Sequence, residues 1–191
     1  KYEDALALFQ EARQADRFNP QPSYESAVTL MHLERIAEAI EQYVLTEELA
    51  PGWFHCRSEM WLAQQILTGR ADPRMFLLIR AVEDGGMTPE AQRKLIEQGL
   101  AQAPDLAILH YLHGKTLRAM PDQAIAAFRR GLLCAEEPDI HTRLLVELAG
   151  MLDPCDERRE LVGRAIEMNG NLIAVATARM IQHFDHEGGL A

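Results

Sequence analysis

The chain has 191 residues, 48% of them apolar and 25% charged, which is enough for one soluble domain with a sizeable core. Its formal net charge of -10 disfavours binding to nucleic-acid phosphates and to an anionic membrane surface. The three cysteines are too few and too far apart for a disulfide framework, so we expect free thiols and a cytoplasmic protein.

The first third of the chain is expected to hold three helices. Apolar residues at helical spacing predict one helix over 1–16. A second is expected over 23–33, with Ser23 as its N-cap, and a third over 35–49. Because the chain opens on Lys1 within a helical pattern, we interpret it as a fragment, a processed form or only the ordered part of a protein. No apolar run approaches the roughly 18 residues that a membrane-spanning helix needs.

Three further helices are expected in the middle of the chain, over 53–68, 72–84 and 88–103. Thr88 followed by Pro89 is typical of a helix start, with the threonine as N-cap and the proline in the first turn. Gly85-Gly86 ends the helix before it.

The stretch 104–136 contains two helical patterns joined by a tight break at Met120-Pro121. Small residues stand where two helices could touch, and large residues stand where the pair would bury a core. The small residues are Gly114, Ala124 and Gly131, and the large ones are Leu109, Leu117, Phe128 and Leu132. This pattern predicts a helical hairpin that cannot bury its whole apolar surface alone.

A pattern of small, aromatic and small residues recurs along the chain. It comprises Ala5, Phe9 and Ala12, then Ala39, Tyr43 and Thr46 one period of 34 residues later, and again Ala124, Phe128 and Gly131. A fixed period of this size indicates stacked helical hairpins, each of which buries its apolar face against the next.

At these positions the chain resembles the tetratricopeptide repeat (TPR) family. Over 104–136, the residues His110, His113, Gly114 and Leu117 fall where the family pattern has Trp, Leu, Gly and Tyr, so the two histidines depart from it. The resemblance implies an all-α fold, a right-handed α-solenoid of antiparallel helical hairpins with about 10–11 helices, that is, a TPR-like superhelix.

The resemblance also implies one TPR-like domain over 1–191. Its parts would be the second helix of a truncated repeat (1–17), repeats at 20–51, 104–136 and 138–170, an irregular middle (53–103) and a capping helix (171–185). Three helices in the middle break the alternation of two helix types. We expect an irregular pair at 53–84, while an insertion at 53–68 remains open.

Several motifs suggest chemistry, but a structural interpretation is favoured for the motifs within the repeats, and the pair near the end of the chain could bind metal adventitiously or belong to a flexible end. Gly114-Lys115-Thr116 matches only the end of a phosphate-binding loop. His110 and His113, like His183 and His186, are spaced to meet one metal ion, yet the first pair stands at core positions of a repeat. We expect the cysteines to pack as well, and no catalytic residue, metal or cofactor.

In TPR proteins the first helices of the hairpins line a concave groove that binds peptides, and this resemblance implies a groove here. Carried over by position, its lining would be Tyr24, Val28, His32, Arg57, Met60, Gln64, Tyr111, Lys115, Arg118, Arg143 and Val146. The four basic residues favour a ligand with a carboxylate or acidic side chains, unless they are ordinary polar residues of half-exposed helices.

We therefore expect a non-enzymatic scaffold or adaptor that binds a peptide or protein segment. The alternative is the assembly or regulatory region of a larger protein whose catalytic or targeting part lies before residue 1. The sequence leaves the oligomeric state open.

Overall fold

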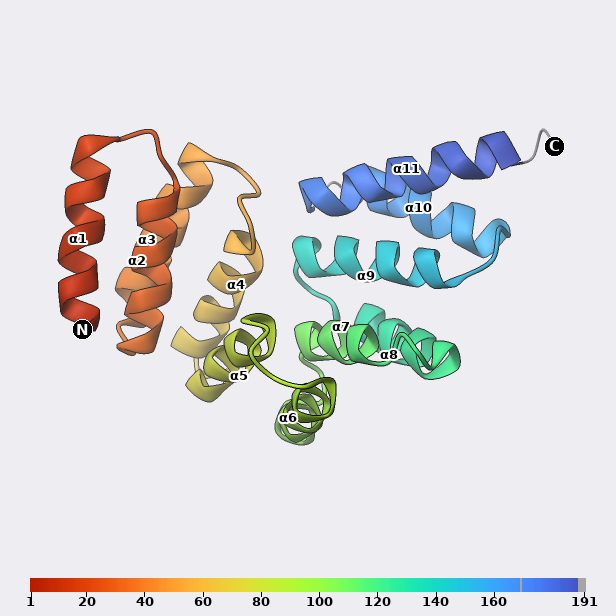
Figure 1. Cartoon of the computed structure of the whole chain (residues 1–191), viewed down its shortest axis with the longest axis horizontal. Coiled ribbons are helices and arrows are strands. Elements are labelled where there is room, and N and C mark those ends of the chain that lie inside the picture. Colours follow the sequence, from red (N-terminus) through yellow and green to blue (C-terminus); the bar gives the residue numbers. More distant parts are fainter. Residues whose placement is uncertain (169, 189–191) are drawn as a thin grey trace. The chain divides into compact units, whose positions relative to one another are not determined.

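The computed structural model describes residues 1–168 and 170–188, and in these ranges it contains eleven helices and no strand (Figure 1). The helices are α1 (Tyr2–Ala15), α2 (Gln21–His32), α3 (Ile36–Leu49), α4 (Cys56–Leu67), α5 (Pro73–Glu83), α6 (Pro89–Gln102), α7 (Ala107–Thr116), α8 (Pro121–Cys134), α9 (Pro138–Met151), α10 (Asp156–Met168) and α11 (Leu172–Gly188). The expected all-α stack of helical hairpins is confirmed.

The chain divides into two compact units, Lys1–Leu77 and Leu78–Ala191, and the boundary falls within α5. In the first unit, α1 packs on α2, α2 on α3 and α3 on α4. Its core contains the fully buried Ala27, Ala39 and Tyr43, so two members of the recurring sequence pattern lie inside the hairpin of α2 and α3.

The second unit contains the hairpins α7–α8 and α9–α10, followed by α11. The first helices of successive hairpins contact one another, α7 with α9 and α9 with α11, and α8 and α10 pack behind them. Leu109, Phe128, Leu144 and Leu145 are buried completely in this core. The hairpins therefore share one core, as expected of a solenoid.

Glycines allow the helices of the second unit to approach closely. A Cβ added at Gly114 would overlap the ring of Phe128, and one at Gly131 would lie 2.8 Å from Cδ2 of Leu144. Ala124 is buried completely. The prediction that these three small residues mark helix contacts is confirmed.

One helix start was predicted correctly and another was not. Thr88 caps α6, because its hydroxyl accepts a hydrogen bond from the amide of Ala91 at 3.3 Å. The prediction that Ser23 is an N-cap is wrong, since α2 begins at Gln21 and Ser23 lies buried in its first turn. The carboxamide oxygen of Asn19 accepts from the Gln21 amide at 3.0 Å, which starts the helix earlier.

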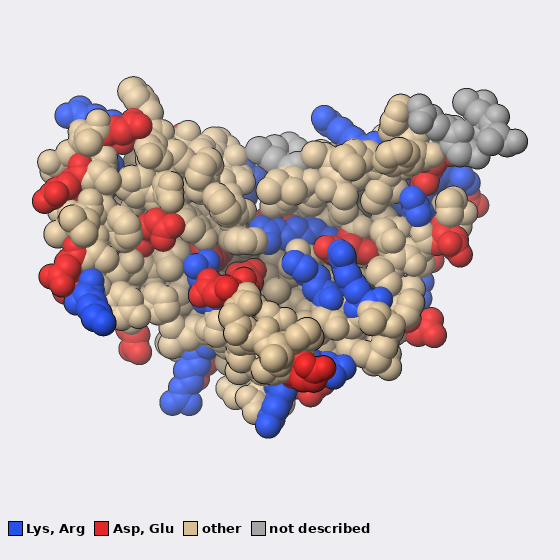
Figure 2. Space-filling model, viewed as in Figure 1, with Lys and Arg blue, Asp and Glu red and all other residues tan. Residues whose placement is uncertain are grey.

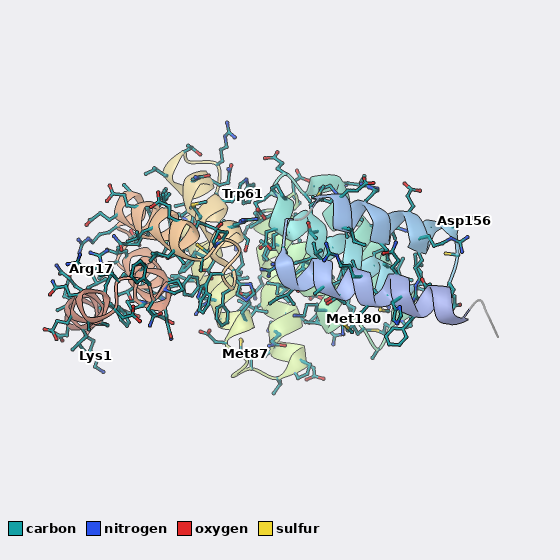
Figure 3. The ribbon with its side chains drawn as sticks, turned by 90° about the horizontal axis from the view of Figure 1, so that it is seen from above. Lys1, Arg17, Trp61, Met87, Asp156 and Met180 are labelled. Atoms are coloured by element: carbon teal, nitrogen blue, oxygen red, sulfur yellow. The ribbon has the colours of Figure 1, made fainter. Side chains whose placement is uncertain are left out.

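Charged side chains are spread over the surface of both units (Figure 2), as expected of amphipathic helices. Large apolar side chains are exposed as well, on α11 at Ile173, Met180 and Phe184 and on other helices at residues such as Leu8 and Leu133. Met180 is labelled in Figure 3, where α11 runs alongside α10. The capping role expected for this helix stays a prediction.

In the described part of the chain, no helix is both long and apolar enough for a membrane span.

Candidate functional site

In the first unit, the aromatic residues predicted for the groove mostly serve packing. Tyr24 and Val28 of α2 are buried, and the Tyr24 ring meets the Tyr43 ring edge-on at a centroid distance of 6.1 Å. His32 is half-buried and stacks on Tyr2 of α1 at 5.4 Å. These rings join α2 to its neighbours, so little of their surface is available to a ligand.

The predicted residues of α4 are more accessible. Gln64 is exposed and Met60 is half-buried. Arg57 forms an ion pair with Glu47, with 2.8 Å between Nε and Oε2, and the other oxygen of Glu47 accepts from the amide of Gly52 at 2.9 Å. The charge of Arg57 is therefore compensated within the chain.

In the second unit, two cations lie close to the ring of Tyr111 in α7. The Lys115 ammonium lies 5.3 Å from the centre of its ring, and the guanidinium carbon of Arg143 in α9 lies 6.0 Å from it. Both distances allow a favourable cation–π interaction. Lys and Arg side chains gather over α7 and α9 in Figure 2. The structure thus brings three of the predicted groove residues together on one face, which we call the Tyr111 face.

Arg143 is buried rather than presented to a ligand. Its side chain is 8% exposed, and its Nη2 and Nε lie 2.8 and 3.2 Å from the two carboxylate oxygens of Asp139. Asp139 also accepts a hydrogen bond from the carboxamide of Asn171, at the start of α11. Breaking such a buried pair is costly, so Asp139 holds Arg143 beside Tyr111. The hydrogen bond between Asn171 and Asp139 connects the start of α11 to α9.

The remaining predicted residues of this face differ in exposure. Arg118, directly after α7, has a side chain that is 57% exposed and forms an ion pair with Glu147 of α9. Val146 is buried. Lys115 is exposed, and no carboxylate of the described residues lies within ion-pair distance of it. Of the four predicted cations, Lys115 is thus the one that no described carboxylate meets at ion-pair distance.

Glu83, at the end of α5, adds a half-buried carboxylate near this face. Burial raises the pKa of Glu83, while the nearby charges of Arg143, Arg80 and Lys115 lower it by a smaller amount. The sequence interpretation missed Glu83, as it missed Asp139 and Glu147. The spacing of four residues between Asp139 and Arg143 could have indicated the ion pair between them from the sequence.

The predicted packing role of the histidines is confirmed only at His110. This residue is buried, and its Nε2 lies 2.7 Å from the carbonyl oxygen of Pro104. His113 is half-buried, and burial is the main cause that lowers its pKa. The described residues contain no cluster of three or more His, Cys, Asp or Glu that could hold a metal ion. The side chain of His186, the last member of the second predicted pair, lies outside the described part.

The cysteines lie in three different environments. Cys56 is buried and its thiol donates to the carbonyl oxygen of Tyr43 at 3.3 Å, so the predicted packing role is confirmed there. Cys134 is half-buried, and burial raises the pKa of its thiol. For Cys155 the packing prediction is wrong, because this residue is exposed. It lies in the surface turn before α10, where its sulfur accepts from the amide of Arg158 at 3.4 Å.

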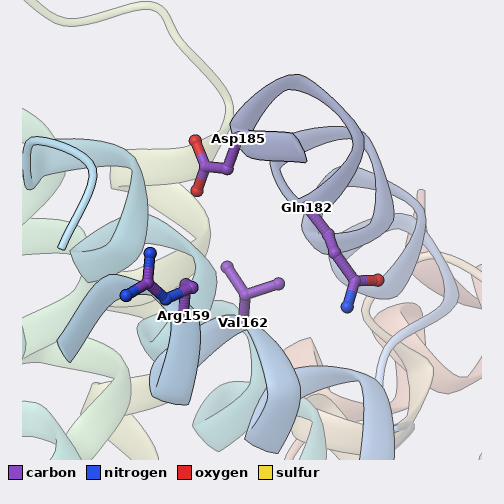
Figure 4. A pocket seen from close by; sticks show the side chains of 4 residues that line it. All are labelled: Arg159, Val162, Gln182 and Asp185. Atoms are coloured by element: carbon purple, nitrogen blue, oxygen red, sulfur yellow. The ribbon is translucent and has the colours of Figure 1, made fainter. Parts of the chain in front are cut away.

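A cavity of about 210 Å³ lies against α10 and α11, where Arg159, Val162, Gln182 and Asp185 line it (Figure 4). Its charged groups already have partners. Asp185 forms an ion pair with Arg158 at 2.9 Å, and Arg159 forms one with Asp156. Both charged side chains that line this cavity are therefore already paired, and neither indicates a charged ligand.

No protein-family model matches this chain, and neither does any curated protein. Several solved structures are similar to it. TTC0263, a TPR protein of Thermus thermophilus, is 21% identical over 95% of this chain and 90% of that chain, with a TM-score of 0.44. A MamA RS-1 double mutant is 17% identical over 88% and 85% of the two chains, with a TM-score of 0.41. A MamA fragment of Desulfovibrio magneticus RS-1 is 16% identical over 95% and 86%, with a TM-score of 0.35.

Proposed function

We propose that this chain is a non-enzymatic interaction module and that the Tyr111 face binds an acidic segment of a partner protein. The observation that supports this most directly is Lys115. Its ammonium group is exposed beside an aromatic ring, and no carboxylate of the described residues lies within ion-pair distance of it. A carboxylate of the partner would form a charge-assisted hydrogen bond with Lys115 without breaking an internal ion pair.

The neighbouring cations would contribute in different ways. Arg118 is exposed enough to share its guanidinium between Glu147 and a ligand. Arg143 would act indirectly, because its pair with Asp139 holds it against the Tyr111 ring. Because the chain as a whole carries a net charge of -10, attraction of an acidic partner would be confined to such a local cationic face.

In the first unit, the accessible residues that were predicted for a groove lie on α4. Met60 and Gln64 of α4 are accessible, whereas the charge of Arg57 is compensated by Glu47. We propose, separately from the Tyr111 face, that α4 offers uncharged contacts to the side chains of a protein partner.

The proposal is tested by fluorescence anisotropy with a labelled peptide rich in Asp and Glu, compared with its Asn and Gln counterpart. We expect the acidic peptide to bind more tightly, and its affinity to fall as salt concentration rises. Lys115→Gln should weaken binding about tenfold, because a hydrogen bond to a charged group contributes about 1.5–3 kcal/mol.

The matched control is Lys94→Gln, which removes an exposed lysine from α6 in the same unit. This variant should bind the acidic peptide as the unaltered chain does. The proposal fails if Lys115→Gln binds the peptide with unchanged affinity, or if both substitutions weaken it equally through loss of overall charge.

A further inference from the structure

The first unit contains a cavity of about 230 Å³ among α1, α2 and α3. Leu6, Phe9 and Leu30 provide apolar lining, and Leu30 is buried while Leu6 and Phe9 are half-buried. Typical pockets for drug-sized ligands occupy roughly 300–1,000 Å³. This cavity is smaller, so its occupant would be a group of a few heavy atoms.

The remaining lining is polar and includes two arginines with different surroundings. Arg35 is compensated by two carboxylates. Its Nη2 lies 2.6 Å from an oxygen of Glu38, and its Nη1 lies 3.3 Å from one of Glu3. The side-chain hydrogen bond to Arg35 is accordingly the main cause that lowers the pKa of Glu38.

Arg13 has no such compensation. Its Nη1 donates to the carboxamide oxygen of Gln42 at 3.2 Å, and no carboxylate of the described residues lies within ion-pair distance of it. A carboxamide satisfies one N–H group but does not neutralise the charge, and a guanidinium has five N–H donors. Glu38, the carboxylate that lines this cavity, is paired with Arg35. Arg13 is therefore the cavity cation whose charge no ion pair among the described residues compensates, in a chain with a net charge of -10.

We propose that this cavity binds a carboxylate attached to a short apolar group. The guanidinium of Arg13 would bind the carboxylate, since a planar fork of N–H donors suits two carboxylate oxygens. Leu6, Phe9 and Leu30 would contact the apolar group. Gln10 and Gln42 supply neutral hydrogen-bonding groups that do not repel an anion.

Binding would also affect how α1 is held. The structure describes every residue of α1, and none of its side chains is fully buried, so this helix depends on partial contacts such as that between Arg13 and Gln42. A ligand that contacts both α1 and α3 would stabilise α1 against α2 and α3, because ligands stabilise the state that binds them. The proposal is independent of the Tyr111 face, which lies in the other unit.

The test is an NMR titration of the ¹⁵N-labelled chain with 3-methylbutanoate at constant pH and ionic strength. We expect saturable shifts of the amide signals of Leu6, Arg13 and Gln42. The uncharged 3-methylbutanamide should produce shifts only at much higher concentration. Arg13→Gln should weaken binding of the acid at least tenfold, while the matched control Arg17→Gln, an exposed arginine just after α1, should leave it unchanged.

A second variant tests the cavity without changing charge. Ser26 lines it, and Ser26→Leu would fill part of the volume, so this variant should also lose binding while its helical circular dichroism is retained. A peptide that ends in leucine, with a free or an amidated C-terminus, identifies the source of the carboxylate. Tighter binding of the free peptide acid than of 3-methylbutanoate would support a chain terminus as ligand, and the reverse would support a small molecule.

The proposal would be overturned by any of three results. The first is that neither acid gives saturable shifts at the cavity residues. The second is that the amide binds as tightly as the acid. The third is that folded Arg13→Gln binds the acid with unchanged affinity.

Discussion

At the scale of single residues, the contact between Gly114 and Phe128 sets how closely α7 and α8 approach. We predict that Gly114→Ala lowers the free energy of unfolding by about 1–3 kcal/mol, the usual cost of overpacking a core. The added Cβ would overlap a phenyl ring that is buried completely and cannot move without displacing its neighbours. Urea denaturation followed by circular dichroism measures the change.

Gly163→Ala is the matched control for this prediction. Gly163 lies inside α10, and no atom lies within 4 Å of the position that its Cβ would take. Alanine restricts the unfolded chain and favours helix, so this variant should be more stable by about 0.5–1 kcal/mol. If both variants changed stability in the same direction, the steric explanation for Gly114 would be wrong.

At the scale of secondary-structure elements, a buried carboxylate starts α9. The two oxygens of Glu137 accept hydrogen bonds from the amides of Asp139 and Ile140, each at 2.9 Å. Burial raises the pKa of Glu137 by more than these two hydrogen bonds lower it. The folded state therefore holds the proton of Glu137 to higher pH than the unfolded state does.

This shift predicts a specific pH dependence. The contribution of protonated Glu137 to the free energy of unfolding is fully present below its unfolded pKa of about 4.3 and is lost as pH rises through the folded pKa. As pH rises from 4 to 7, the free energy of unfolding of the unaltered chain should therefore decrease relative to that of Glu137→Gln. Chemical denaturation at several pH values measures this difference.

The exposed neighbour Glu136 provides the control for the cap. Glu136→Gln removes the same charge next to the same helix but leaves both hydrogen bonds of Glu137 in place. Its stability difference from the unaltered chain should vary less with pH. An equally strong pH dependence in both variants would assign the effect to general charge rather than to burial of Glu137.

The elements also show what the sequence could predict. The hairpin of α7 and α8 was predictable from the sequence. The small residues Gly114 and Ala124 and the large residue Phe128 stand at helical spacing and indicate a local contact between two helices. The helices of the middle region were predicted individually. The irregular pair expected at 53–84 stays a prediction, since pairing depends on packing between distant residues. The compensation of Arg118 by Glu147, 29 positions away, likewise required the folded chain.

At the scale of the whole molecule, the chain consists of two compact units, each with its own core. In a stack of repeats, each hairpin is stabilised mainly by its neighbours, so local unfolding can be confined to part of the chain. The sequence predicted a single domain over 1–191, and this prediction remains open. Whether the two units unfold together is therefore a question for experiment.

We predict that destabilising one unit increases hydrogen exchange in that unit alone. Gly114→Ala should speed exchange of amides in α7 and α8 and leave those of α2 and α3 unchanged, because its steric effect acts within the core of the second unit. Ala39→Gly should do the reverse, since Ala39 is buried completely between the helices of the first unit. Hydrogen exchange followed by mass spectrometry of peptides from each helix measures both responses. Equal acceleration in both units by either variant would show that the chain unfolds cooperatively as one domain.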